Sequence, residues 1–329
     1  MKQRLRHIYI LGIISVLLCS CRLAEKSSDL LHMNTVTEKD GNISETTKNQ
    51  ECNEMEADFH FPTAEGEVIY GGNAESNMVT IDASNVSRGY IMVKCENGSE
   101  ANKKVIIQGP SAVKYTYDLN TEGRYETYIL SDGEGQYSVS VHENIEGSKY
   151  STLFSQKINM TLANAFLPFL CPNQYVDYTM ESQVVKLAEA LTADMDHDLE
   201  KVQTVYHYVV ENITYDKQKA QTVQSGYLPN IDEVLRQKKG ICFDYAAVMT
   251  AMLRSQHIPT KLVTGFTGTT YHAWISTYTE ETGWVEGVIY FDGTTWKLMD
   301  PTFASNDTSE DHRKRYIGNN RNYTEKYIY

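Results

Sequence analysis

Three side chains in the last third of the sequence are of the types needed for acyl transfer by a thiol. Cys242 stands directly in front of an alanine- and methionine-rich run, His272 lies in "YHAW", and Asp300 ends "WKLMD". A thiol nucleophile needs a base to remove its proton and later an acid to protonate the leaving amine, and that base needs a third group to fix its tautomer. Cysteine, histidine and aspartate can fill these three roles, so Cys242 is a candidate nucleophile, although a cysteine before a helix can equally be a small core residue.

The predicted secondary structure places these residues at the start of a helix and on strands. The run after Cys242 has apolar residues at helical spacing, which predicts a helix from this cysteine to near Gln256. The unpaired amides and the dipole of a helix N-terminus favour a thiolate over a thiol. His272 and Asp300 lie in segments with a period of two, which predicts neighbouring strands of a small antiparallel sheet packed on that helix. The predicted strands are "TKLVTGF", "YHAWISTYT", "GVIYF" and "TWKLMDP".

Three further helices are predicted upstream of the cysteine. Two are amphipathic, and a third, shorter helix runs from Ile231 to Lys238, with Asn230 as its N-cap and Gly240 as its stop. Helices followed by an antiparallel sheet predict an α+β domain over residues 163–329. The apolar stripes of the two amphipathic helices are Val184, Leu187, Ala188 and Leu191, and then Leu199, Val202, Tyr206, Val209 and Ile213.

The residues around the three candidates carry more information than their spacing. The chain reads "GICFDYAAVMTAMLRSQHIPTKLVTG", then "YHAWI", then "WKLMDPTF". These segments closely resemble the core of the transglutaminase-like superfamily, whose members carry Gly-x-Cys-x-Asp-Tyr-Ala before a helix, His-Ala-Trp on a strand and Asp-Pro-Thr on the next. The resemblance covers about residues 181–304 and implies a papain-like α+β fold. It also implies that Cys242 is the nucleophile, His272 the general base and acid, and Asp300 the carboxylate that orients the imidazole.

Two features depart from that family pattern and bear on the substrate groove. Ser276 stands where many relatives place an acid, and the stretch 279–295 is longer than in the shortest members. In the superfamily a polar side chain near the thiol helps to bind the oxyanion, and Tyr227 is a candidate for that donor. The backbone amide of Cys242 is the other candidate, because a donor aimed at the developing negative oxygen contributes about 2.7–4 kcal/mol.

The chemistry of such a site is acyl transfer through a thioester. The thiolate attacks an amide carbonyl, and protonation of the departing nitrogen leaves the acyl group on sulfur. Water then gives hydrolysis, as in a protease or deamidase, whereas a lysine amine gives an isopeptide crosslink, as in a transglutaminase. We expect hydrolysis of peptide or amide bonds, with protein crosslinking as the alternative. A catalytically inert surface-binding module is a possibility from another class, but the intact set of Cys242, His272 and Asp300 argues against it.

The N-terminus has the pattern of an export signal. Three basic residues precede the apolar run "IYILGIISVLL", which is too short to span a bilayer permanently. The following "LCSC" resembles the lipobox of bacterial lipoproteins, which implies that residues 1–20 are a signal peptide and that Cys21 is lipidated. We therefore expect the protein in the bacterial cell envelope, held to the outer face of the cytoplasmic membrane by acyl chains. A plain secretory signal with a coincidental Cys21 is the alternative.

Two regions separate the signal from the α+β domain. Residues 21–60 are rich in Ser, Thr, Asn, Glu and Lys, which predicts a flexible tether. Residues 61–162 alternate with a period of two in about eight short runs, which predicts an immunoglobulin-like β-sandwich. Cys95 is expected in the core of that sandwich, and a disulfide with Cys52 is less favoured because nothing in the sequence brings the two together. Cys171, in the junction, is expected to be buried and structural.

Composition and charge argue against several other functions. The chain has 329 residues, of which 41% are hydrophobic, and a formal net charge of −13, so it is a folded, acidic protein that repels phosphate backbones. Nucleic acid is therefore not an expected partner. No run of spaced carboxylates resembles a calcium loop, and a zinc site made of Cys242, His272 and Asp300 lacks the paired spacing that zinc sites usually show. We expect no cofactor and no metal, and as partners a protein or peptide substrate and the membrane that holds the lipid anchor.

Overall fold

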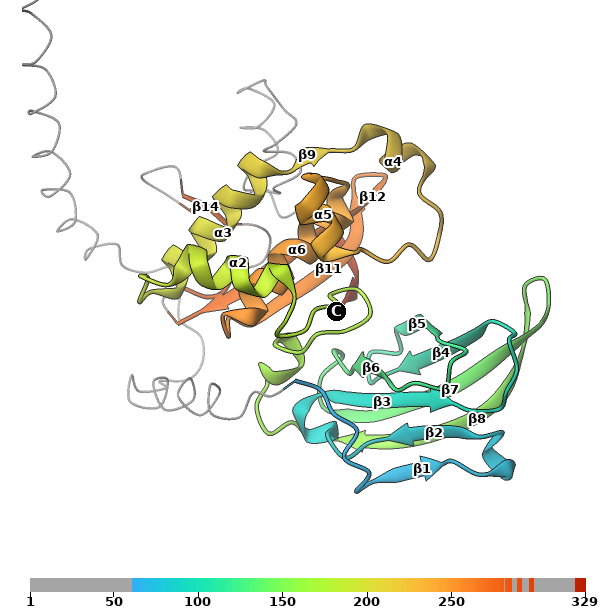
Figure 1. Cartoon of the computed structure of the whole chain (residues 1–329). Coiled ribbons are helices and arrows are strands. Elements are labelled where there is room, and N and C mark those ends of the chain that lie inside the picture. The colour runs from blue at the N-terminus through green and yellow to red at the C-terminus, as the bar shows by residue number, and fades with distance from the viewer. Residues whose placement is uncertain (1–60, 281, 286–288, 292–295, 299–322) are drawn as a thin grey trace, which may run out of the picture. The chain divides into compact units, whose positions relative to one another are not determined.

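The computed structural model describes residues 61–329 except 281, 286–288, 292–295 and 299–322 (Figure 1). All described residues belong to one compact unit of the chain. The predicted signal peptide, Cys21 and the predicted tether lie outside the described residues, and their assignments stay predictions. Within the described residues, no helix combines the length and the apolar content needed to cross a bilayer.

The first described region consists of two four-stranded antiparallel sheets that face each other (Figure 1). The strand order is β1-β2-β3-β6 in one sheet and β5-β4-β7-β8 in the other. The first sheet is made of β1 Ile69–Gly71, β2 Val79–Asp82, β3 Tyr90–Cys95 and β6 Glu126–Ile129, and the second of β5 Lys114–Leu119, β4 Lys103–Gln108, β7 Gly135–Glu146 and β8 Lys149–Met160. Three-residue 3-10 turns lie at Ala74–Ser76, Val86–Arg88 and Leu167–Phe169.

The alternation seen in the sequence is the reason these segments form sheets. In β7, Tyr137, Val139 and Val141 are buried while their neighbours are less so, as one face of a sheet requires. Tyr117 of β5 and Tyr128 of β6 meet edge to face across the two layers, with ring centroids 5.1 Å apart. The immunoglobulin type is not confirmed, because β1, β2 and β3 form a simple meander instead of the interleaved strand order of that fold.

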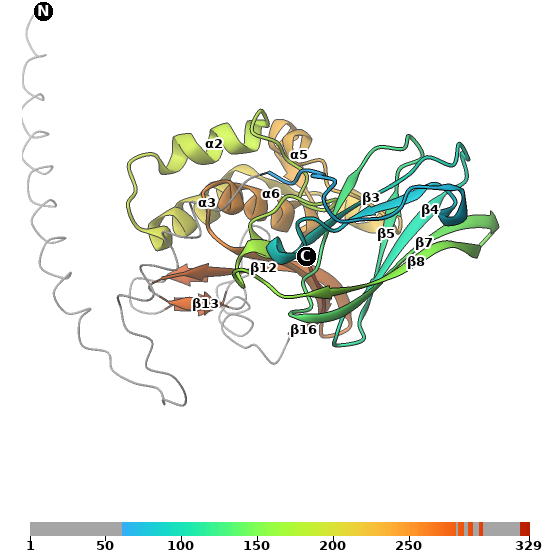
Figure 2. The same cartoon turned by 90° about the horizontal axis from the view of Figure 1, so that it is seen from below.

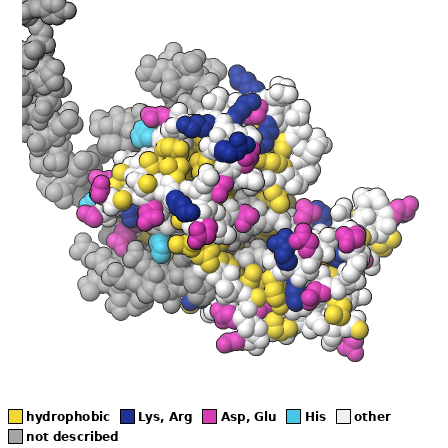
Figure 3. Space-filling view, in the orientation of Figure 1, with side chains coloured by type: hydrophobic (Ala, Val, Ile, Leu, Met, Phe, Trp, Pro, Cys, Tyr) yellow, Lys and Arg dark blue, Asp and Glu magenta, His cyan; other side chains and the backbone are white. Residues whose placement is uncertain are grey.

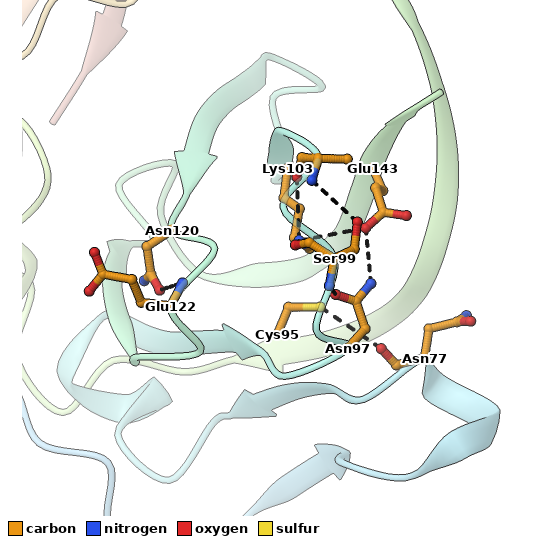
Figure 4. A network of polar contacts seen from close by, with 9 residues as sticks. Asn77, Cys95, Asn97, Ser99, Lys103, Asn120, Glu122 and Glu143 are labelled. Carbon is orange, nitrogen blue, oxygen red and sulfur yellow. Dashed lines mark hydrogen bonds and ion pairs between the residues drawn. The ribbon is translucent and has the colours of Figure 1, made fainter. Parts of the chain in front are cut away.

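A buried lysine holds one end of these sheets together. The side chain of Lys103 is almost fully buried, and its ammonium donates to the carbonyl oxygens of Ser99 and Ala101. It also lies 3.5 Å from a carboxylate oxygen of Glu143, which accepts a hydrogen bond of 3.0 Å from the amide of Asn97 (Figure 4). Because a buried ammonium needs partners for all its protons, this loop is fixed by the charge that it surrounds.

The second described region is an α+β domain in which a sheet of order β13-β12-β11-β16 packs against helix α6. Helices α2, α3 and α5 surround the other sides of α6, and Figure 2 shows α2, α3 and α6 on one side of β12 and β13. The elements are α2 Gln183–Thr192, α3 Asp198–Asn212, β9 Thr214–Tyr215, α4 Lys217–Thr222, α5 Ile231–Gln237, β10 Lys239–Gly240, α6 Cys242–Ser255, β11 Thr260–Thr267, β12 Thr270–Thr279, β13 Gly283–Val285, β14 Ile289–Phe291, β15 Trp296–Leu298 and β16 Tyr323–Ile328.

The predicted helices are confirmed, with one correction at the end of α5. Asn230 caps this helix by accepting from the backbone N–H of Glu233, as expected. The helix ends at Lys238, which adopts the left-handed conformation with φ 54°, and Gly240 is not its stop. Gly240 lies in β10 instead, where an added Cβ would stand only 2.6 Å from the Cβ of Asp244. The glycine is therefore needed for the close approach of β10 to α6.

A buried arginine ties together three distant parts of the domain. Arg254, at the end of α6, is fully buried, and its guanidinium donates to the carbonyl oxygens of Thr260, Cys171 and Tyr329. Cys171 itself is buried, which confirms the structural role predicted for it. Burial lowers the pKa of Arg254 to about 10, so the guanidinium stays charged at neutral pH.

The charged side chains of this acidic protein are not evenly spread. On the face drawn in Figure 3, lysine and arginine side chains gather over the helical part of the chain, and acidic side chains are scattered across the rest. Arg236, Lys238 and Lys239, at the end of α5 and the start of β10, are exposed. These three residues lie immediately before the helix that begins with Cys242.

Candidate active site

Cys242 is the first residue of α6. The preceding residue, Ile241, has extended backbone angles, so the chain turns into the helix at the cysteine itself. The thiol is free and half-buried, whereas Cys95 and Cys171, the other described cysteines, are free and buried. The predicted place of the nucleophile at a helix N-terminus, where unpaired amides face outward, is present in the structure.

His272 lies on β12, the strand against which α6 packs most extensively. Its side chain is 7% exposed, and its backbone stands opposite Gly265 of β11. The structure thus brings the helix of Cys242 and the strand of His272 into contact, as the sequence predicted.

Gly265 allows three strands to meet beside the histidine. A Cβ added there would lie 2.0 Å from the carbonyl oxygen of Thr324 on β16 and 2.9 Å from the ring of Trp274. Gly265 stands opposite His272, and opposed residues of antiparallel strands project to the same side of the sheet. Trp274, two residues after His272, projects to this side as well, and its ring covers the place where a side chain of Gly265 would be. The indole ring and the backbone of β16 therefore fill the space beside Gly265, opposite His272.

The strand that leads to Asp300 is not a neighbour of β12. β12 pairs with β11 along its length and with β13 only at Thr277–Thr279, whereas the described β15 pairs with β14 in a separate two-stranded sheet. The expected pairing of the strands of His272 and Asp300 is therefore not found among the residues that the structure describes. Asp300 itself lies outside the described residues, and its role stays a prediction.

Asp244, two residues after the cysteine, is the centre of a polar network that the sequence analysis missed. Its carboxylate is completely buried and accepts three hydrogen bonds. The backbone N–H of Ile241 donates over 2.8 Å, the Lys219 ammonium over 2.6 Å, and the Tyr227 hydroxyl over 2.5 Å. The Lys219 ammonium also lies 2.5 Å from the Tyr227 hydroxyl oxygen, which closes a triangle of three side chains. An acid at the third position of a helix was the available signal, because such an acid can bond to the N-cap amide.

Tyr227 was the predicted side-chain donor to an oxyanion. In the structure its hydroxyl donates to Asp244, and burial together with this hydrogen bond raises the pKa of Tyr227 well above its ordinary value. The phenol is therefore neutral and already has an acceptor. A role as oxyanion donor stays a prediction, and the backbone amide of Cys242 remains the other candidate.

Lys219 is directed toward Asp244 by the strands and the helix that precede it. β9 pairs in parallel with β10, and the N–H of Asp216 donates to the carbonyl oxygen of Gly240 over 2.8 Å. Asp216 then caps α4 by accepting from the N–H of Lys219 over 2.9 Å. The backbone of Lys219 is thus held next to the segment that enters α6, so its side chain can reach the buried carboxylate.

Metal binding has no support in the described part of the chain. Among the residues that the structure describes, no group of three His, Cys, Asp or Glu side chains is arranged to hold a metal ion.

Ser276, which stands where relatives have an acid, is buried on β12 opposite Lys261.

Comparison with known families assigns the α+β region. Residues 185–287 match the family model described as the transglutaminase-like superfamily, which supports a transglutaminase-like, papain-like α+β fold for this part of the chain. The matched range includes Cys242 and His272 and ends before Asp300.

Individual relatives are distant. The uncharacterized protein YebA of Bacillus subtilis is 28% identical over 152 residues, which is 40% of this chain and only 20% of that one. Among solved structures, a candidate cysteine protease from Cytophaga hutchinsonii has 14% identity and a TM-score of 0.36, over 70% of this chain and 72% of that one. The transglutaminase of red sea bream has 14% identity and a TM-score of 0.27, over 67% of this chain and 48% of that one.

Proposed function

We propose that this protein is a thiol enzyme of the cell envelope that acts on peptide or amide bonds. Cys242 is the nucleophile, His272 the general base and acid, and Asp300 the carboxylate that orients the imidazole. The observation that best supports the proposal is the position of Cys242, a half-buried free thiol at the first position of a helix that packs on the strand of His272. A thiol in this position combines stabilisation of its anion with access to a base.

The proposed reaction has two halves. The Cys242 thiolate forms a bond to the carbonyl carbon, the backbone amide of Cys242 binds the oxyanion, and His272 gives a proton to the nitrogen as the carbon–nitrogen bond breaks. A thioester remains. In the second half His272 takes a proton from water, which adds to the thioester and releases the acid and the thiolate. If a lysine amine replaces the water, the product is a crosslink.

Selective alkylation tests the nucleophile. The full-length chain is treated with iodoacetamide near neutral pH, digested, and analysed by mass spectrometry for the modified cysteine. We expect Cys242 to react first and its rate to fall sharply in His272→Ala. Cys95 and Cys171 serve as internal controls, because burial raises the pKa of both thiols, that of Cys171 to about 12. A rate at Cys242 no faster than that of free cysteine, and unchanged by His272→Ala, would show a binding module instead.

A second assay separates hydrolysis from crosslinking. The protein is incubated with a mixture of cell-envelope proteins, and new amino termini and the incorporation of a labelled primary amine are measured together. We expect new termini or released ammonia that depend on Cys242, with little amine incorporated. Faster incorporation of the amine than hydrolysis would identify a crosslinking enzyme.

The lipid anchor at Cys21 is a separate part of the proposal. Growth with an alkyne-tagged fatty acid, followed by coupling to a dye, reports acylation directly. We expect label in the wild-type protein and none in Cys21→Ser. Label that is absent from both proteins would instead indicate a plain secretory signal.

A further inference from the structure

Asp244 presents an electrostatic problem for the proposed nucleophile. Its buried carboxylate lies in the first turn of α6, the same turn that begins with Cys242. The carboxylate accepts from the backbone N–H of Ile241, the residue before Cys242, over 2.8 Å, so a thiolate at Cys242 would form next to the segment that holds a buried anion and would be disfavoured by it. The positive end of the helix dipole stabilises an anion, and here both the Cys242 thiolate and the Asp244 carboxylate would lie in the first turn of the helix.

Lys219 is the cation that the structure places on this carboxylate. Its ammonium lies 2.6 Å from one oxygen of Asp244, and its side chain is 29% exposed while that of Asp244 is completely buried. Tyr227 contributes a hydrogen bond to the other oxygen but no charge, because the pKa of its phenol is raised. The two donors therefore differ in what they do, since Lys219 neutralises the carboxylate and Tyr227 only orients it.

Other ionisable groups near the first turn of α6 already have contacts of their own. Asp216 pairs with Lys239 over 3.1 Å, Glu233 pairs with Arg236, and Asp232 accepts from two backbone N–H groups of α2. None of these contacts involves Asp244. Other titratable groups on the adjoining elements include His272 and Tyr271 of β12, Tyr215 of β9, Lys217 of α4, Tyr245 of α6, and Tyr175, which packs on Phe243.

We propose that Lys219 is a positioning residue of the active site, which neutralises Asp244 so that the thiolate of Cys242 can form beside it. Tyr227 and the pairing of β9 with β10 hold the ammonium in place for this purpose. The inference rests on the proposed function, because it assigns Lys219 a role in forming the nucleophile.

The pH profile of alkylation tests this inference. The rate of iodoacetamide modification at Cys242 is measured against pH in the full-length wild type, Lys219→Met, Lys219→Arg, Asp244→Asn and the double variant Lys219→Met/Asp244→Asn. Lys219→Met leaves an uncompensated buried carboxylate, so the midpoint of its profile should rise by about one pH unit. Asp244→Asn leaves the cation alone, so its midpoint should fall by about as much. The double variant and Lys219→Arg should both return close to the wild type.

Midpoints that shift in opposite directions in the two single variants and return in the double variant indicate an electrostatic effect. A purely structural defect would slow alkylation in all variants without moving their midpoints in opposite directions. Equal midpoints in the wild type and Lys219→Met would overturn the inference while leaving the proposed function intact. A wild-type rate that does not depend on His272 would overturn the proposed function itself. If Asp244→Asn does not fold, as judged by circular dichroism, the comparison of Lys219→Met with Lys219→Arg decides the matter alone.

Discussion

Replacement of Arg254 by methionine should destabilise the domain more than replacement of any arginine on its surface. Methionine keeps a similar unbranched stem but has no donor, so the substitution removes the three hydrogen bonds to Thr260, Cys171 and Tyr329. A buried carbonyl that loses its partner costs about 1–3 kcal/mol. The change also removes the cost of burying a guanidinium, which offsets part of this loss.

The expected net effect is about 3–5 kcal/mol in the free energy of unfolding, from three carbonyls at about 1–3 kcal/mol each, less the relieved cost of burying the charge. Urea unfolding followed by far-ultraviolet circular dichroism measures it. With a slope of about 3 kcal/mol per molar urea, the midpoint should fall by about 1–2 M. The substitution removes one donor from three carbonyls and hardly changes the surface that unfolding exposes. The dependence of the unfolding free energy on urea concentration should therefore stay unchanged.

Arg236→Met is the matched control. It is the same substitution on a side chain that is 64% exposed and paired with Glu233, and an exposed ion pair contributes less than about 1 kcal/mol. Equal midpoints for the two variants would refute the reasoning, because they would mean that the guanidinium of Arg254 does not hold these carbonyls in solution.

Three other substitutions probe positions with clear geometry. Gly240→Ala should displace Asp244, because the new Cβ would stand 2.6 Å from the Cβ of that residue, and should slow alkylation of Cys242 several-fold; an unchanged rate would contradict the close approach. Gly265→Ala should separate β11 from β16, since its Cβ would meet a backbone oxygen at 2.0 Å, and hydrogen exchange of the β16 amides should rise by at least tenfold. Glu143→Gln tests a pH effect: burial acts to raise the pKa of Glu143, but hydrogen bonds from Asn97 and Ser99 and the Lys103 charge outweigh it, and the pKa is lowered. A carboxylate whose pKa is lower in the folded state stabilises the fold above its unfolded pKa, and this stabilisation is lost as the pH falls through the folded pKa. The difference in urea midpoint between the wild type and Glu143→Gln should therefore shrink below about pH 4.5.

The elements around the site could be predicted because their sequence patterns are local. A helix that begins at Cys242 and a strand through His272 follow from apolar spacing, and the structure confirms both. The cap at Asn230 was equally predictable, since it depends on one side chain and an amide three residues away. Such features are decided within a few residues of the chain, and one sequence is enough to detect them.

The parts that sequence analysis missed depend on contacts between distant segments. β16 pairs with β11, which lies about sixty residues earlier in the sequence, and no local pattern in Tyr323–Ile328 indicates this pairing. The ion pair of Lys219 with Asp244 joins residues 25 positions apart and depends on a parallel bridge of two residues. The expected adjacency of the strands of His272 and Asp300 also concerns distant segments, and the described β15 pairs with β14 instead of β12.

The pairing of β16 with β11 has a consequence for the order in which the protein matures. The strand next to that of His272 acquires its second neighbour only from residues 323–328, and Tyr329 then exchanges two backbone hydrogen bonds with Leu262. During synthesis these residues leave the ribosome long after Cys242 and His272, so the sheet that holds the histidine is still incomplete when both have emerged. The backbone around His272 therefore reaches its final pairing only after β16 has been made.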